Sequence, residues 1–122
     1  MNKYRSNFEH TFSVFLDQKG IRYEYEPTKF SYTPKERTYT PDFFLPDYDI
    51  YIETKGLFVS EDRTKHLLVR EQNPDVEIRF IFQNLKNKLY KGSKTTYADW
   101  CEKHEFKYAQ DEMPTPWWMR RK

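Results

Sequence analysis

The sequence predicts a mixed α/β domain in which helices cover a single β-sheet. Apolar residues recur with helical spacing in three segments and alternate with polar residues in others. These segments follow the order helix, three strands, helix, strand and helix, which is typical of a sheet packed between helices. A length of 122 residues fits one small domain, so we expect residues 1–122 to form it. The 10 Phe, 10 Tyr and 3 Trp residues can bury enough apolar surface for a thin core.

The first helix is predicted to begin after Ser6. Ser6 and Glu9 have the spacing of a capping box, and aromatic residues recur at helical spacing as far as Leu16. Gly20 is a candidate C-cap for this helix. Residues 21–25 then alternate apolar and charged side chains, which predicts a half-buried strand.

Residues 28–38 have no clean periodicity, and residues 34–37 within them are expected to form an exposed connection. Two strand-like runs follow, over residues 39–45 and 48–53, on either side of Pro46 and Asp47. This arrangement is typical of a β-hairpin.

A second helix is predicted to begin at Ser60 and to end before Pro74, with Leu67 and Leu68 facing inward. Acidic residues in its first turn suit the helix dipole. Residues 76–82 then alternate and become apolar, which predicts another strand.

The third helix is predicted to be capped by Thr96 with Asp99. It carries Cys101, which is expected to be a packing residue. A single cysteine excludes an internal disulfide and favours a reducing setting inside the cell. The C-terminal tail, residues 113–122, is expected to pack on the surface.

Charge alone does not decide the partner of this chain. There are 21 basic and 19 acidic residues, with a net charge of +2. Basic residues gather in residues 63–70 and 86–94, a distribution that fits either nucleic-acid binding or a solvated surface. No apolar run is long enough for a membrane span and no signal peptide opens the chain. We therefore expect a cytoplasmic protein that does not bind a membrane. We also expect no small-molecule cofactor.

The hairpin carries the strongest chemical signal. If its turn is centred between Asp47 and Tyr48, Asp42 lies opposite Glu53. Two carboxylates facing each other across a strand pair repel, and a divalent cation between them would remove the repulsion. Strand alternation places Lys55 on the same face as Glu53.

Two carboxylates and an ammonium beside a divalent cation form a set that can hydrolyse a phosphodiester. The cation acidifies a bound water, and the lysine can position that water or neutralise developing charge. The alternative is a Pro-Asp turn and an ordinary charged strand face, since Glu-x-Lys triplets are common on exposed strands. A register slip of one residue would also separate the two acids.

The spacing of Pro41-Asp42 and Glu53-Thr54-Lys55 resembles the PD-(D/E)xK nuclease pattern. A fuller resemblance, over nearly the whole chain, is to the bacteriophage endonuclease I family of four-way (Holliday) junction resolvases. The segments that carry it are residues 39–43, 45–46, 53–57, 65–68, 70–72, 88–93 and 102–104.

The resemblance implies a restriction-endonuclease-like fold, with a mixed central sheet flanked by helices. It also implies catalytic roles for Glu9, Asp42, Glu53 and Lys55. Asp42 and Glu53, with the backbone carbonyl of Thr54, would bind Mg²⁺, with Mn²⁺ as a substitute. Glu9 would help hold a second ion, so that each site takes one or two. From the residues alone, the capping box already explains Glu9.

The resemblance further implies a strand- or domain-swapped homodimer acting on branched DNA. Residues 28–38 would bridge the subunits, and Glu9 of one chain would complete the site of the other. Phosphate contacts are expected from nine basic side chains: Lys35, Arg37, Arg63, Lys65, His66, Arg70, Lys88, Lys91 and Lys94.

Three alternatives remain open from the sequence. The first is a sequence-specific nuclease of the same superfamily, and the second is a DNA-binding module without catalysis. The third is a structural protein, which leaves the facing acids unexplained. Retention of both carboxylates and the lysine favours an enzyme.

Overall fold

A five-stranded mixed sheet organises the chain in a computed structural model that describes residues 3–32 and 37–118. Its strands, in spatial order, are β1 (Glu24–Tyr25), β4 (Phe43–Leu45), β5 (Ile50–Lys55), β6 (Ile78–Phe82) and β7 (Tyr108–Gln110). The pairs β1–β4 and β4–β5 are antiparallel, whereas β5–β6 and β6–β7 are parallel. The predicted mixed α/β class is confirmed.

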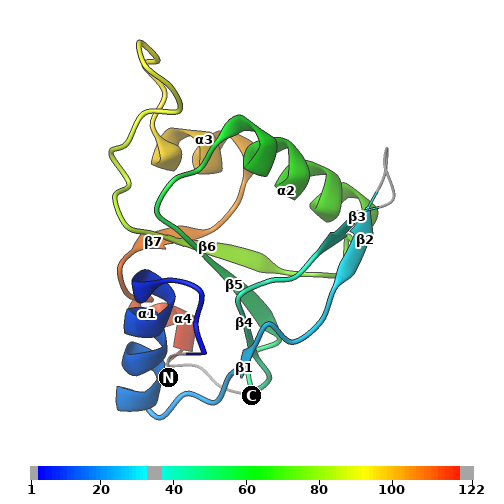
Figure 1. Cartoon of the computed structure of the whole chain (residues 1–122), viewed down its shortest axis with the longest axis vertical. Coiled ribbons are helices and arrows are strands. Elements are labelled where there is room, and N and C mark those ends of the chain that lie inside the picture. Colours follow the sequence, from blue (N-terminus) through cyan, green and yellow to red (C-terminus); the bar gives the residue numbers. More distant parts are fainter. Residues whose placement is uncertain (1–2, 33–36, 119–122) are drawn as a thin grey trace.

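Helices cover both faces of this sheet (Figure 1). One face is covered by α1 (Asn7–Gln18) and the short α4 (Thr115–Trp118), and the other by α2 (Ser60–Gln72) and α3 (Tyr97–His104). The predicted start of the second helix at Ser60 is confirmed, and the helix ends just before Pro74. No helix in the described part of the chain is long and apolar enough to cross a bilayer.

The side chains of β6 divide the core into two halves. Phe80 and Phe82 face α2 and α3, where they pack with Trp100. Ile81 points to the opposite face and packs in the cluster that contains Phe12 of α1. Each such side chain contributes about 1.5–3 kcal/mol by leaving water. Both faces of β6 are therefore buried, which explains its nearly continuous apolar sequence.

A separate two-stranded antiparallel sheet, β2 (Phe30–Tyr32) and β3 (Arg37–Tyr39), packs against α2 (Figure 1). Tyr32 and Tyr39 are buried there with Val69 of α2. The prediction of an irregular segment over residues 28–38 was therefore wrong for the part that the structure describes. Two strands of three residues are too short to produce a readable period.

Two other strand predictions need correction, and one strand was missed. The predicted run 39–45 is divided between β3 and β4, because Pro41 lacks the N–H that a continuous ladder needs. The strand predicted over residues 21–25 is paired only at β1, and Ile21 is buried in the core without strand pairing. The edge strand β7 was not predicted, since three residues at a sheet edge carry little apolar signal.

The predictions of which helix residues face the core were only partly correct. Leu67 and Leu68 are half-buried, whereas His66 and Val69 are the fully buried residues of α2. In the third helix, the Thr96–Asp99 capping box is confirmed, and Cys101 packs in the core.

The beginning of the C-terminal tail is part of the core. Met113 is buried in the same cluster as α1, although the whole tail was expected to lie on the surface. Trp117 of α4 packs against this cluster, and the guanidinium of Arg79 lies 5.1 Å from its ring centroid.

Candidate active site

The β4–β5 register places the two predicted acids opposite each other. Phe43 pairs with Ile52 and Leu45 with Ile50, so continuing this antiparallel register puts Asp42 opposite Glu53. The exposed fractions of the two residues are only 3% and 5%. The predicted register is confirmed, and it buries two carboxyl groups at one end of the strand pair.

Each acid is held by hydrogen bonds from neighbouring residues. The backbone N–H and the hydroxyl of Thr54 both donate to Oδ2 of Asp42, at 2.9 and 2.8 Å. The hydroxyl of Tyr39, at the end of β3, donates to Oε1 of Glu53 at 2.6 Å. Oε2 of Glu53 lies 3.2 Å from Nζ of Lys55. The two carboxylates therefore have fixed orientations before any ligand binds.

Lys55 lies between two acidic groups. Besides Glu53, its ammonium is 3.5 Å from Oδ2 of Asp62, in the first turn of α2. This confirms that Lys55 and Glu53 share one face of β5. Asp62 also contacts Lys65, with 3.6 Å between the charged atoms.

Glu9 reaches the same region from α1. Its backbone N–H donates to Oγ of Ser6, as the capping box predicts. Its carboxylate, however, accepts from the hydroxyl of Tyr25 and, at 3.0 Å, from the backbone N–H of Arg5 rather than from that of Ser6. The predicted box is therefore half formed, and the Glu9 side chain is directed toward the sheet.

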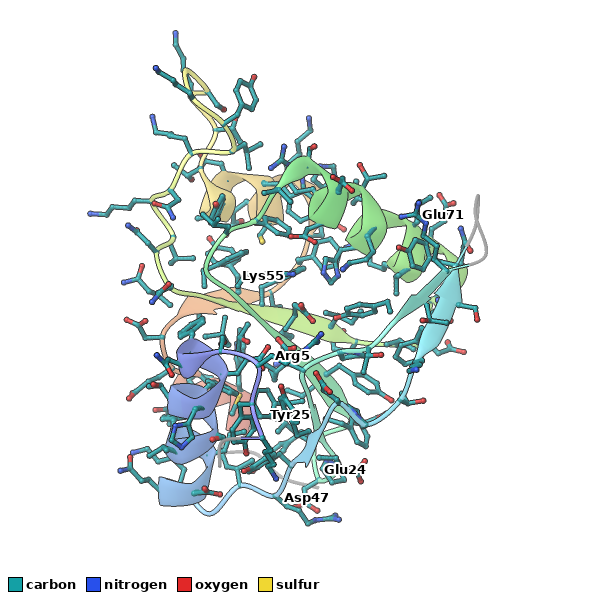
Figure 2. The ribbon with its side chains drawn as sticks, in the orientation of Figure 1. Arg5, Glu24, Tyr25, Asp47, Lys55 and Glu71 are labelled. Atoms are coloured by element: carbon teal, nitrogen blue, oxygen red, sulfur yellow. The ribbon has the colours of Figure 1, made fainter. Side chains whose placement is uncertain are left out.

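One cavity of about 490 Å³ brings these side chains together. Glu9, Asp42, Glu53 and Lys55 all line it, together with Thr54, Tyr39, Arg5 and Lys65. Figure 2 shows Arg5 and Lys55 in the space between α1 and α2. Glu9 of the same chain occupies the position that the resemblance assigns to Glu9 of a partner subunit.

Burial disfavours the charged form of both acids, and neighbouring negative charges add to this effect at Asp42. Burial, the charge of Glu53 and that of Glu9 raise the pKa of Asp42 from 3.8 to about 9, despite the hydrogen bonds from Thr54. Burial also raises the pKa of Glu53, although Lys55 and Tyr39 oppose this effect. For Lys55, burial lowers the pKa, but Glu53 and Asp62 outweigh burial and the net pKa is raised. The charged form of Asp42 is therefore the form that a bound cation would stabilise.

The donor set suits a hard divalent cation such as Mg²⁺. Within residues 3–32 and 37–118, no three His, Cys, Asp or Glu side chains form a metal cage. Mg²⁺ does not need one, because it is commonly held by one or two carboxylates and keeps several waters. Asp42 and Glu53 fit this requirement. The carbonyl of Thr54 as a further ligand stays a prediction, since only its N–H and hydroxyl are seen to contact Asp42.

Sequence reasoning missed four residues that support the site. Tyr39, Tyr25 and Arg5 contact the acids from segments that are remote in sequence or precede the helix. Asp62 was noted only as a favourable charge for the helix dipole. No spacing rule links these residues to the hairpin, so only the tertiary structure could reveal them.

The predicted phosphate contacts fall into different groups. Arg37, Lys88, Lys91 and Lys94 are exposed, and Lys65 lines the cavity. Lys35 lies outside the described residues. These side chains remain candidates for DNA contacts.

Arg63 and Arg70 instead have contacts within the fold. Nη1 of Arg63 donates to the carbonyl of Phe58 at 2.6 Å and to that of Leu89 at 3.4 Å. Arg70 donates to the carbonyl of Glu105 at 3.4 Å, and its guanidinium lies 4.0 Å from the ring centroid of Phe106. Part of their donor capacity is therefore used in holding elements together.

His66 cannot serve as a surface phosphate contact in this structure, which corrects the prediction. Its exposed fraction is 0%, and its ring packs edge-on against Tyr39 and Phe80. Neither ring nitrogen has a hydrogen-bond partner among the residues that the structure describes. Burial, with the nearby charges of Lys55 and Lys65, lowers the pKa of His66 well below 6.5. His66 is therefore a neutral core residue.

Replacing His66 with Phe is expected to remove an acid sensitivity of the fold. Below about pH 6.5 the unfolded chain binds a proton at His66 that the folded chain rejects, so stability falls as the pH falls. Relative to wild type, the variant should gain up to about 2 kcal/mol at about pH 5 and less at neutral pH. Urea unfolding of both proteins at the two pH values would measure this. Parallel pH dependences would mean that His66 titrates within the fold.

The chain that forms this cavity is similar in sequence to known proteins. A family model described as phage endonuclease I matches residues 1–122. Endonuclease I of Escherichia phage T7 is 49% identical over 116 residues, which cover 93% of this chain and 77% of the relative. Endodeoxyribonuclease 1 of Enterobacteria phage T3 is 49% identical over 113 residues, covering 91% and 74%. This chain belongs to the phage endonuclease I family.

Proposed function

We propose that the protein is a Mg²⁺-dependent DNA endonuclease that resolves four-way and other branched junctions. The observation that carries this proposal is the buried pair Asp42 and Glu53 beside the ammonium of Lys55, in a cavity open to a ligand. The relative from phage T3 is named an endodeoxyribonuclease, which supports DNA as the substrate. The resemblance to junction-resolving enzymes supports branched DNA in particular.

Each residue of the site has a distinct proposed role. Asp42 and Glu53 would hold the cation, with the Thr54 carbonyl as a further ligand, and Glu9 would help to hold a second cation. The bound metal would acidify a water and stabilise negative charge on the phosphoryl group. Lys55 would donate a hydrogen bond from Nζ to the reacting phosphate or water and compensate developing charge. Tyr39, which donates to Glu53, would orient that carboxylate.

We also propose that the active form is a domain-swapped homodimer. Two sites fixed relative to each other can cut two strands of a branched DNA. Within one chain, α1 and β1 precede residues 28–38, and β4 and β5 follow them. This segment therefore joins the part that supplies Glu9 to the part that supplies Asp42. An exchange at this segment would leave the contacts of Glu9 unchanged but form them between subunits. We expect the enzyme to act in the cytoplasm of an infected host cell.

A cleavage assay on matched DNA substrates tests the proposed function. Purified protein with Mg²⁺ is expected to nick a synthetic four-way junction symmetrically and to leave a linear duplex of the same sequence largely intact. Mn²⁺ should support the reaction, and EDTA should abolish it. Comparing the rates on the two substrates separates shape recognition from sequence recognition.

The alternative functions predict other results in the same assay. Equal cutting of the linear duplex would identify a sequence-specific nuclease. Binding of DNA without cleavage in Mg²⁺ or Mn²⁺ would identify a non-catalytic module. The absence of both binding and cleavage would overturn the proposal altogether.

A further inference from the structure

We propose that Tyr90 stacks on an unpaired or unstacked base of the DNA substrate. Tyr90 lies in the loop of residues 84–96, called here the basic loop, which projects at the top of Figure 1. The inference rests on the proposed function and deepens it, since it names the feature of branched DNA that the protein would read. It goes beyond phosphate contacts. These contacts do not touch the bases, so they cannot detect the exposed bases of a branch.

The basic loop has a defined conformation. The N–H of Leu89 donates to the carbonyl of Thr95 at 2.9 Å, and the N–H of Tyr97 to the carbonyl of Asn87 at 2.9 Å. At the tip, the N–H of Ser93 donates to the carbonyl of Tyr90 at 3.0 Å. Gly92, with a φ of +89°, takes the third position of this turn, where a type II turn requires a positive φ. The backbone at the tip, from which the Tyr90 side chain extends, therefore has a defined turn before DNA arrives.

The loop separates an inner side from an outer side. Leu85 and Leu89 pack against the aromatic cluster under α3, whereas the alternating residues Lys86, Lys88 and Tyr90 are exposed. The exposed fraction of Tyr90 is 65%, among the highest of the large apolar side chains in the described part of the chain. The packing that anchors the loop therefore does not use the Tyr90 ring.

The charge around Tyr90 selects a polyanion as the partner. The basic loop carries Lys86, Lys88, Lys91 and Lys94, and it contains no acidic residue. All four lysines are exposed, so the loop that carries Tyr90 presents a net positive charge to the solvent. An aromatic face among lysines is the combination that binds single-stranded nucleic acid, because bases stack on the ring while cations contact phosphates. A protein partner would have to be strongly acidic to fit the same surface.

The loop is also connected to the catalytic end of the sheet. β5 and β6 are parallel, so their C-terminal ends lie at the same edge. At that edge, the N–H of Gln83, just before the loop, donates to the carbonyl of Lys55 at 3.0 Å. Arg63 links the loop to the segment after β5, since it donates to the carbonyls of Leu89 and Phe58. DNA bound along this edge would contact both the loop and the cavity.

Stacking on Tyr90 requires an open base face. In an intact duplex the faces of neighbouring bases cover each other, and stacking on a protein ring must first separate them. At a bulge or a branch point that cost is already reduced. The ring is therefore expected to favour distorted DNA, while the lysines contribute equally to all forms.

The test compares three variants on two DNA probes, in EDTA so that nothing is cut. One probe is an intact duplex, and the other is the same duplex with an unpaired 2-aminopurine in a central bulge. Tyr90→Ala is expected to raise the Kd for bulged DNA roughly 5- to 100-fold and the Kd for the duplex by less than about twofold. Tyr90→Phe keeps the ring and should behave as wild type. Lys91→Ala should weaken both complexes alike and lower their salt dependence.

Fluorescence gives a second readout that is independent of affinity. Stacking on the ring should quench 2-aminopurine in complexes with wild type and Tyr90→Phe, but not with Tyr90→Ala. If Tyr90→Ala has the same affinity and the same quenching as wild type, the inference is overturned. If Tyr90→Phe is as defective as Tyr90→Ala, the inference is also overturned, because the hydroxyl rather than the ring face would then bind the DNA. If wild type resolves junctions in either case, the proposed function stands. If wild type binds no DNA, both fail.

Discussion

Replacing Lys55 with alanine is expected to lower the rate of junction cleavage roughly 10²- to 10³-fold, which is the usual cost of removing one preorganised donor from a reacting centre. Nζ of Lys55 lies 3.2 Å from Glu53 and 3.5 Å from Asp62, at the wall of the cavity. Its loss removes the ammonium that contacts both Glu53 and Asp62. Junction affinity should change little, because many exposed lysines share the binding of phosphates.

Single-turnover cleavage with enzyme in excess measures the rate, and a gel shift in EDTA measures the affinity. Lys103→Ala, an exposed lysine on α3, provides the matched control and should keep both values. Full activity of Lys55→Ala would refute the site assignment. A loss of affinity as large as the loss of rate would mean that Lys55 holds the DNA rather than assisting its hydrolysis.

Replacing Asp42 with asparagine is expected to abolish cleavage and yet stabilise the metal-free protein. In the folded chain the pKa of Asp42 is raised to about 9, above the ordinary value of 3.8. The folded state therefore binds a proton that the unfolded state releases between about pH 4 and about pH 9, so stability falls as the pH rises through this window. Asparagine carries no charge and cannot titrate. In EDTA the variant should melt several degrees above wild type at about pH 8, with a smaller gap at about pH 5.

Adding Mg²⁺ should reverse this order. A ligand that binds only the folded state raises its stability, so the melting temperature of wild type should increase with Mg²⁺ concentration while that of Asp42→Asn stays constant. Thermal melts with and without Mg²⁺ measure both effects. A variant less stable than wild type in EDTA at the higher pH would show that the Asp42 carboxylate stabilises the fold by itself. A wild type insensitive to Mg²⁺ would argue against the proposed metal site.

The central chemistry of the site could be predicted because it depends on one short hairpin. In an antiparallel pair, the turn position alone fixes which residues face each other, and strand alternation then fixes the face. Asp42, Glu53 and Lys55 follow from these two rules. The burial of the acids, which raises the pKa of each, could not be read from the hairpin because it depends on α1, α2 and β3 packing around it.

Contacts between remote segments were beyond the sequence rules. Glu9 is explained locally by its bond to Ser6, and only the fold brings its carboxylate to Tyr25 and the cavity. His66 was predicted to contact phosphate because it lies among Arg63, Lys65 and Arg70 in the sequence, but the fold packs its ring against Tyr39 and Phe80. The short strands β2, β3 and β7 are specified by neighbours rather than by their own periodicity.

The bond from Tyr39 to Glu53 has a consequence for how such a chain can change its length. Tyr39 and Asp42 are three positions apart, and each is tied to a different residue of β5: Tyr39 to Glu53 and Asp42 to Thr54. An insertion or deletion between them would break one tie while keeping the other. In evolution and in protein engineering, the number of residues between Tyr39 and Asp42 is therefore expected to stay constant. Changes of length near this site are expected to be tolerated only before β3.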